Sequence, residues 1–308
     1  MASNKIPSRI GEISYTNRGH HKMTIIEYHT NQNVIVEFED GSTKKVTYQS
    51  FRLGEVSFEN RYNGKIFTCA NGGYCKVINR EKGDGYCLVE FDGIENQRCS
   101  VYYSNLIKGL IKNPWSPSVS GVGYIGKQFD GTLSKSNAYK HWCKMLDRCY
   151  NSSNKKYKFY GAKGVKVCDE WLCYANYERW FNDHFYEIEN EDMVVDKDLL
   201  IKGNKIYDEE HCVIVPKTIN LALTKADSIR GDYPIGVSYR SQNNNYIASI
   251  TINDEFKHLG CYSNSTDAFY AYKKAKEDYL KQLADKYKGI IPQNVYDALY
   301  AYEVEITD

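Results

Sequence analysis

The chain has 308 residues, a hydrophobic fraction of 42% and a formal net charge of +1 at pH 7. Its length exceeds what one small core needs, so we expect two or three domains. No run approaches the roughly 20 apolar residues that cross a bilayer, and the N-terminal residues 1–5 lack the apolar core of a signal peptide. We therefore expect a cytoplasmic protein with no membrane partner.

Ten cysteines and 28 tyrosines stand out in the composition. No two cysteines form the CxxC pair with which a tight turn presents two ligands to zinc, so we expect reduced, half-buried cysteines of a cytosolic protein. Tyrosine is amphipathic and suits wet interfaces, which also admits a homo-oligomer.

The charge is unevenly distributed along the chain. Residues 127–166 hold ten Lys or Arg but only two acids, Asp130 and Asp147, whereas residues 227–308 hold nine basic and twelve acidic side chains. A local excess of cations is the electrostatic footprint of nucleic-acid binding. The middle of the chain is therefore where we expect DNA contacts.

The first 115 residues contain a degenerate repeat. Residues 36–41 read VEFEDG and residues 89–93 read VEFDG, and each copy is followed by a similar segment, at 48–54 and at 103–109. Alternating apolar and polar residues around Asp-Gly are typical of short antiparallel strands joined by tight hairpins. We predict two small barrels or one sandwich, with either a binding or a structural role.

The remaining sequence predicts a mixture of helices and short strands. Residues 113–123 have the proline, serine and glycine content of a linker. Helical spacing then begins at Asn137, an expected N-cap, and recurs from Tyr177. After a turn-rich segment at 227–234, residues 236–262 predict three strands with turns at 243–245 and 253–254, followed by helices from about Thr266 and after Pro292.

The middle of the chain carries an ordered set of motifs. They read WxxMxxRCY at 142–150, YGxxGVxVCxEW at 160–171, VDKD at 195–198, GNxxY at 203–207 and VxVPxxIN at 213–220. Together they resemble a bacteriophage family of HNH-type (His-Me finger) proteins over residues 121–226.

That resemblance implies a ββα module in which the first strand and the helix hold one divalent metal, Mg or Mn, against the scissile phosphate. It matches Asp196 to the strand ligand and Asn220 to the helix ligand. His211 falls near the middle Asn position of the motif. Lys197 occupies the position of the general base, where a histidine normally stands.

Lys197 leaves the hydrolytic step open. A lysine of ordinary pKa is protonated at neutral pH, and the flanking Asp196 and Asp198 push that pKa further up. Lys197 therefore suits a phosphate contact or a carboxylate partner, and His211 or a solvent hydroxide would have to act as the base. A catalytic protein would need the metal cofactor, whereas a retained fold without hydrolysis would need none.

Residues 155–166 combine five lysines and three aromatic residues with no acid. Lysines neutralise phosphates, aromatic rings stack, and the pair Gly161 and Gly164 permits close backbone approach, as a DNA-binding loop needs. The alternative is a solvated loop with buried aromatic side chains. The charge bias favours DNA contact by Lys155, Lys156, Lys158, Lys163 and Lys166.

Residues 234–278 resemble the ethylene-response-factor type of DNA-binding domain, through GVxxR at 236–240, YxAxI at 246–250, LGxY at 259–262 and DAxxAY at 267–272. The resemblance implies a three-stranded sheet that enters the major groove. Arg240 matches a position that reads bases or phosphates, whereas other expected arginines are replaced by Ser241, Asn243, Thr251 and Asn253. A packing or oligomerisation role is the alternative.

These observations predict an α+β, multi-domain protein. Tandem small β-rich repeats are expected over residues 1–115, an HNH-like ββα module over 121–226, and an ethylene-response-factor-like sheet-helix module with a C-terminal helix over 232–308. We expect a phage-type protein of the host cytoplasm that binds double-stranded DNA, either a homing-like metal-dependent endonuclease or a cleavage-deficient derivative. The alternative is a non-catalytic phage protein that binds and inhibits a host nuclease or anti-phage defence complex, because protein interfaces favour Tyr and Trp over Lys.

Overall fold

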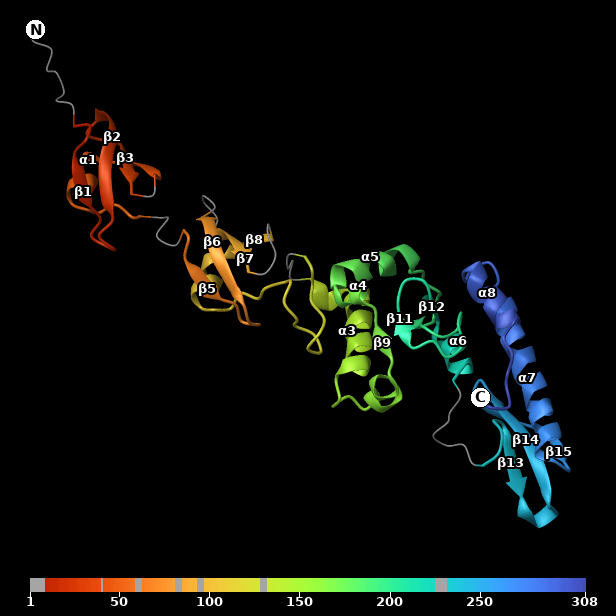
Figure 1. Cartoon of the computed structure of the whole chain (residues 1–308). Coiled ribbons are helices and arrows are strands. Elements are labelled where there is room, and N and C mark those ends of the chain that lie inside the picture. The colour runs from red at the N-terminus through yellow and green to blue at the C-terminus, as the bar shows by residue number, and fades with distance from the viewer. Residues whose placement is uncertain are drawn as a thin grey trace, which may run out of the picture. The chain divides into compact units, whose positions relative to one another are not determined.

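The computed structural model describes residues 9–39, 41–58, 63–80, 85–92, 97–127, 132–224 and 232–308. Of the positions discussed above, residues 1–5, Asp40, Gly93, Asp130 and residues 227–231 of the turn-rich segment lie outside this description. The chain divides into two compact units, Met1–Ser116 and Pro117–Asp308. Helices and antiparallel sheets occur together, which confirms the predicted α+β class (Figure 1). No helix within the described residues is both long and apolar enough to cross a membrane.

The first unit carries two antiparallel sheets, each of four strands and each followed by a short helix. The first comprises β1 (Ile13–Tyr15), β2 (Lys22–Thr30), β3 (Asn33–Phe38) and β4 (Thr43–Val46), with α1 (Tyr48–Arg52). The second comprises β5 (Ile66–Thr68), β6 (Tyr74–Arg80), β7 (Tyr86–Phe91) and β8 (Arg98–Tyr102), with α2 (Tyr103–Ile107). The predicted antiparallel repeat is confirmed.

The repeated acidic residue has the same task in both sheets. The backbone N–H of Lys22 donates to the Glu39 carboxylate at 2.7 Å, and the backbone N–H of Tyr74 donates to the Asp92 carboxylate at 2.8 Å. In each case the carboxylate satisfies a donor at the start of the second strand. The sequence repeat is therefore a repeat of hydrogen bonding as well as of apolar positions.

The segment 113–123 is packed, although its composition predicts a linker. Asn113 is 3% exposed, and Trp115 packs against the core of the second sheet. Val119 and Gly123 pair as an isolated antiparallel bridge. Large and hydrogen-bonding side chains thus hold each end of the segment to its own unit, which proline and glycine content does not reveal.

The second unit begins with helices and short strands. They are η1 (Leu133–Lys135), α3 (Asn137–Tyr150), η2 (Tyr157–Phe159), η3 (Gly161–Lys163), β9 (Lys166–Val167), α4 (Asp169–Leu172), α5 (Tyr174–His184), β10 (Met193–Asp196), β11 (Ile206–Tyr207), β12 (Val213–Pro216) and α6 (Lys217–Ala222). The cap of α3 is Ser136, one residue before the predicted Asn137, because its hydroxyl accepts the N–H of Tyr139 at 3.3 Å. β10 and β12 pair antiparallel with Asp196 opposite Val213, and α6 follows at once.

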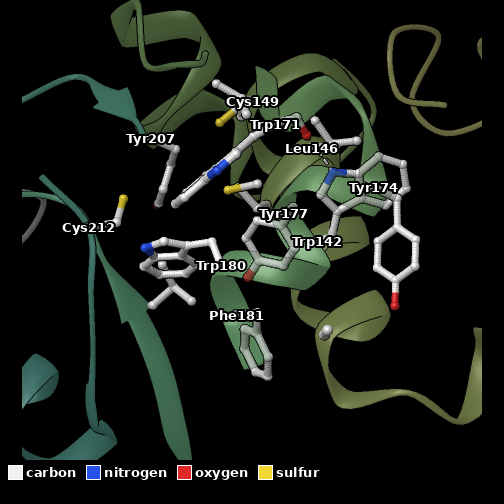
Figure 2. Packing of buried hydrophobic residues seen from close by; sticks show 14 of the residues in the cluster. Trp142, Leu146, Cys149, Trp171, Tyr174, Tyr177, Trp180, Phe181, Tyr207 and Cys212 are labelled. Carbon is white, nitrogen blue, oxygen red and sulfur yellow. Dashed lines mark hydrogen bonds between the residues drawn. The ribbon is translucent and has the colours of Figure 1, made fainter. Parts of the chain in front are cut away.

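An aromatic core joins α3, α4 and α5 to the β10–β12 pair (Figure 2). The Trp142 indole N–H donates to the carbonyl of Trp171 at 2.7 Å, and the rings of Trp171 and Trp180 lie 4.5 Å apart. Tyr207, the last residue of β11, and Cys212, which directly precedes β12, enter the same core. This core fixes α3 relative to β10, and so it positions the candidate site.

The chain ends with a three-stranded antiparallel sheet followed by helices, as predicted. The elements are β13 (Val237–Arg240), η5 (Ser241–Asn243), β14 (Asn245–Ile252), β15 (Glu255–Tyr262), α7 (Ser265–Lys286) and α8 (Gln293–Tyr300). Asn253 and Asp254 have φ angles of 51° and 63°, which places the predicted turn in the left-handed region that Asn and Asp tolerate.

Helix α7 takes part in two cores. Its first half packs Phe269 and Tyr272 with Ile250 of the sheet. Its second half packs Leu280 and Leu283 with residues of β12, α6 and α8. The sheet-helix part and the β10–β12–α6 part of the second unit therefore share packing through one helix.

Candidate nucleic-acid interface

Asp196 ends β10 and is buried, at 7% exposure. One of its oxygens, Oδ1, accepts the backbone N–H groups of Asp198 at 2.9 Å and Leu199 at 2.8 Å. Burial, and then the negative charge of Asp198, raises the pKa of this carboxyl to about 6. The side chain thus shapes the turn after β10 in the manner of an Asx-turn.

Lys197 is also buried, at 8% exposure. Its Nζ donates to Asp198 Oδ2 at 2.9 Å and to the carbonyl of Asn204 at 2.7 Å. The Asn204 amide donates in return to the carbonyl of Lys197 at 2.7 Å. These bonds use the ammonium as a donor, so Lys197 holds the loop after β10 and has no lone pair for taking a proton from water.

His211 precedes β12 and is half-buried. Its Nδ1 lies 2.7 Å from Asp208 Oδ1 and 2.8 Å from Asp208 Oδ2. A carboxylate on Nδ1 leaves Nε2 as the nitrogen that can accept a proton, which is the arrangement of histidines that act as general bases.

A divalent metal fits poorly at Asp196. Asn220, the second expected ligand, is a half-buried residue of α6, and the hydrogen bonds of Asp196 go to the turn instead. Across the described ranges no group of three or more His, Cys, Asp or Glu could hold a metal. Mg²⁺ keeps several waters and bridges to phosphate, and Asp196 is only 7% exposed for such contacts.

A groove of about 1270 Å³ lies between α3 with its following loop and the residues that lead into β10. One wall carries the cationic side chains Lys144, Arg148, Lys155 and Lys156. Acidic residues form the other wall, where Glu191 accepts a hydrogen bond from Thr218 at 2.8 Å. The first wall also carries Asp147 and the second Lys217, so the walls differ in their balance of charge, and the first is the more cationic.

The cations of the α3 wall share a helix face with His141. His141 lines the groove three residues before Lys144 and seven before Arg148, so the three side chains share one face of the helix. The pKa of His141 is lowered, first by burial and then by the charges of Lys144 and Arg148. His141 is consequently neutral at physiological pH, and the cations define the character of the wall.

The loop after α3 is built on hydrogen bonds to Asp147. This carboxylate accepts the side-chain amide of Asn151 at 2.6 Å and that of Asn154. Asn154 in turn accepts the backbone N–H of Lys156 at 2.7 Å. Asp147, one of the two acids in residues 127–166, thus fixes the loop that carries Lys155 and Lys156 to the groove.

The two glycines of this loop allow close packing, but against the protein itself. A Cβ atom at Gly161 would lie 2.1 Å from the carbonyl oxygen of Cys149 and 2.3 Å from the Tyr157 ring. Gly164 faces open space and has a φ of 82°. Gly161 therefore lets the loop close onto the end of α3, and Gly164 supplies a left-handed turn.

The five predicted lysines are all exposed, at positions 155, 156, 158, 163 and 166. Lys155 and Lys156 line the groove, whereas the other three do not. The aromatic residues divide between the two alternatives, since Tyr160 is half-buried and Phe159 is 46% exposed. Arg240, at the end of β13, is exposed but is not part of the groove.

Sequence reasoning missed Arg148 and Lys144 as site residues. Both lie in α3 at a spacing of four, and Arg148 belongs to the WxxMxxRCY motif. A signal was available, because residues four apart on a helix project from the same face. What the spacing does not give is the loop that brings Lys155 and Lys156 beside them.

No protein family, curated protein or solved structure matches this chain.

Proposed function

We propose that this protein binds double-stranded DNA through the α3 wall of the groove, as an HNH-type module that holds DNA without cutting it. The observation that carries the proposal is the convergence of Lys144, Arg148, Lys155 and Lys156 on one wall. Neutralisation of phosphates by Lys and Arg supplies most of the non-specific affinity of DNA-binding proteins.

Two features of β10 support binding without cleavage. Asp196 is buried and bonded to the turn, and Lys197 is a hydrogen-bond donor to Asp198 and Asn204. A nuclease of this type needs a carboxylate that reaches metal and phosphate, and a base that can accept a proton. The order of β10, β12 and α6 agrees with the ββα module that the resemblance implies.

Duplex DNA binding in a salt series tests the proposal. We expect the affinity of the full-length protein to fall with rising NaCl, because counterions are released. Replacing both groove lysines, as Lys155→Gln with Lys156→Gln, should lower the salt slope by about two. Lys274→Gln with Lys288→Gln, two exposed residues of the C-terminal helical region, is the matched control and should leave the slope unchanged. Absence of salt-sensitive binding by the unmodified protein would sink the proposal.

A second candidate, metal-dependent cleavage, is favoured by the His211–Asp208 pair. It requires Asp196 to become accessible, which the buried carboxylate does not offer in this arrangement. Inhibition of a host nuclease is the outcome to consider if DNA binding is absent, and a stable host protein recovered with the chain would then support it.

A further inference from the structure

We infer that Arg148 is the residue that receives a backbone phosphate of the bound DNA. The inference rests on the proposed function and adds a specific anchor to it. Sequence motifs mark Arg148 as part of a helix, and nothing in them assigns it a ligand.

Two tyrosine rings hold the guanidinium of Arg148. Its Cζ atom lies 4.8 Å from the centroid of Tyr160 and 4.8 Å from that of Tyr207. Tyr207 is 2% exposed and belongs to the aromatic core, so one of these two rings is held rigidly. Stacking fixes the plane of a guanidinium and pre-organises its donors.

The charge of Arg148 has no acceptor within the protein as described. Its Nε is buried and without a hydrogen-bond partner, and it forms no ion pair with any described residue. Because Nε is buried, a ligand can supply acceptors only to the Nη atoms of this half-buried cation. The planar fork of arginine matches two oxygens of a phosphate, which form parallel, charge-assisted hydrogen bonds.

The surroundings favour a polyanion over a single free anion. Lys144 precedes Arg148 by one helical turn, and Lys155 and Lys156 continue the same wall along the loop. Several cations on one wall can neutralise more than one phosphate, which favours a nucleic-acid strand over a single anion. Among these cations Arg148 is the one held by two tyrosine rings, whereas the neighbouring lysines are exposed.

The test compares Arg148→Gln, Arg148→Lys and the control Arg179→Gln, in which an exposed arginine of α5 is replaced. Duplex affinity is measured in a salt series, and thermal unfolding is measured on the same samples. Arg148→Gln should weaken binding on the order of tenfold, the loss expected for charge-assisted hydrogen bonds, and should lower the salt slope by about one. Arg148→Lys should keep the slope but lose affinity, because lysine lacks the fork. Arg179→Gln should change neither.

The outcomes separate this inference from the proposed function. If the unmodified protein does not bind DNA, the proposed function fails. If it binds and both Arg148 variants retain affinity and slope, only the inference fails. If Arg148→Gln lowers the melting temperature, the test rests on Arg148→Lys. Full DNA affinity of a folded Arg148→Lys protein would then overturn the assignment. Replacing chloride by inorganic phosphate at equal ionic strength should leave affinity unchanged, and a selective loss that Arg148→Gln abolishes would identify a free-phosphate site instead.

Discussion

Two charged regions of the second unit adjoin β10, and they use their charges differently. At the end of the strand, Asp196 and Lys197 are less than a tenth exposed and are bonded to the turn and loop that follow. In the groove, Arg148, Lys155 and Lys156 have no acidic partner among the described residues, and the two lysines are exposed. Partnered charges stabilise a turn, whereas unpartnered charges are available to a ligand. The motif at 195–198, which carries part of the resemblance, is thus distinct from the residues that we propose bind DNA.

The largest expected effect comes from adding a Cβ atom where the loop packs tightly on the end of α3. Gly161→Ala would place Cβ 2.1 Å from the Cys149 carbonyl, so the loop must move off α3. We expect a loss of about 3 kcal/mol in the free energy of unfolding, measured in urea, together with weaker DNA binding. Gly164→Ala, which meets only its positive φ, should cost about 1 kcal/mol. Equal stability of Gly161→Ala and Gly164→Ala would contradict the close packing of the loop on α3 that holds its lysines at the groove.

The pH dependence of the free energy of unfolding tests the burial of Asp196 at the end of β10. The pKa of Asp196 is about 6 in the folded protein, above the ordinary value of 3.8. Because the folded state binds this proton more tightly, the stabilisation is fully present below about pH 4 and is lost as pH rises through about 6. The difference is on the order of 3 kcal/mol.

Asp196→Asn removes the titrating group. The unfolding free energy of the unmodified protein relative to that of Asp196→Asn should therefore fall as pH rises through that range and be constant above it. Chemical denaturation at a series of pH values measures this difference. A difference that is constant from pH 4 to 7.5 would show that the carboxyl is not buried as described.

The hydrogen bonds of Asp196 give a smaller effect at fixed pH. Asn at this position keeps an oxygen acceptor for the N–H groups of Asp198 and Leu199, whereas Ala leaves both donors without one. We expect Asp196→Ala to be about 2 kcal/mol less stable than Asp196→Asn at pH 7.5 in denaturant unfolding. Equal stability would remove the structural role assigned to this side chain.

The smallest expected effect is that of Lys197→Gln. Glutamine keeps one donor for the Asn204 carbonyl but loses the pair with Asp198, which is 48% exposed and can be solvated. We expect a loss of about 1 kcal/mol in stability and no change in DNA affinity. A drop in affinity at unchanged stability would instead place Lys197 on a phosphate, as the sequence alone allows.

The sequence predicts those structural features that depend on residues close together along the chain. The turn at Asn253 and Asp254 follows from residues that tolerate positive φ, and the repeat of β3 and β7 follows from alternation around Glu39 and Asp92. The candidate site depends on contacts across the chain. Arg148 meets Tyr207 only because the aromatic core brings β11 to α3, and no local pattern carries that information.

The same limit applies to Lys197. Its position in the motif suggests a catalytic residue, and its flanking acids suggest a pair. The bond to the Asn204 carbonyl exists only once the loop has folded back on the strand. The boundary between the two units falls within the predicted linker, after Ser116, but the composition does not reveal that Trp115 packs on the sheet that precedes it.

We propose that the protein binds double-stranded DNA without cleaving it. The most direct measurement incubates supercoiled plasmid with the full-length protein and Mg²⁺ or Mn²⁺, beside Asp196→Asn, and follows retention and nicking in the same samples. We predict equal, salt-sensitive retention by both proteins and no nicking by either. Nicking by the unmodified protein that Asp196→Asn abolishes would contradict the claim and would make Asp196 a catalytic ligand.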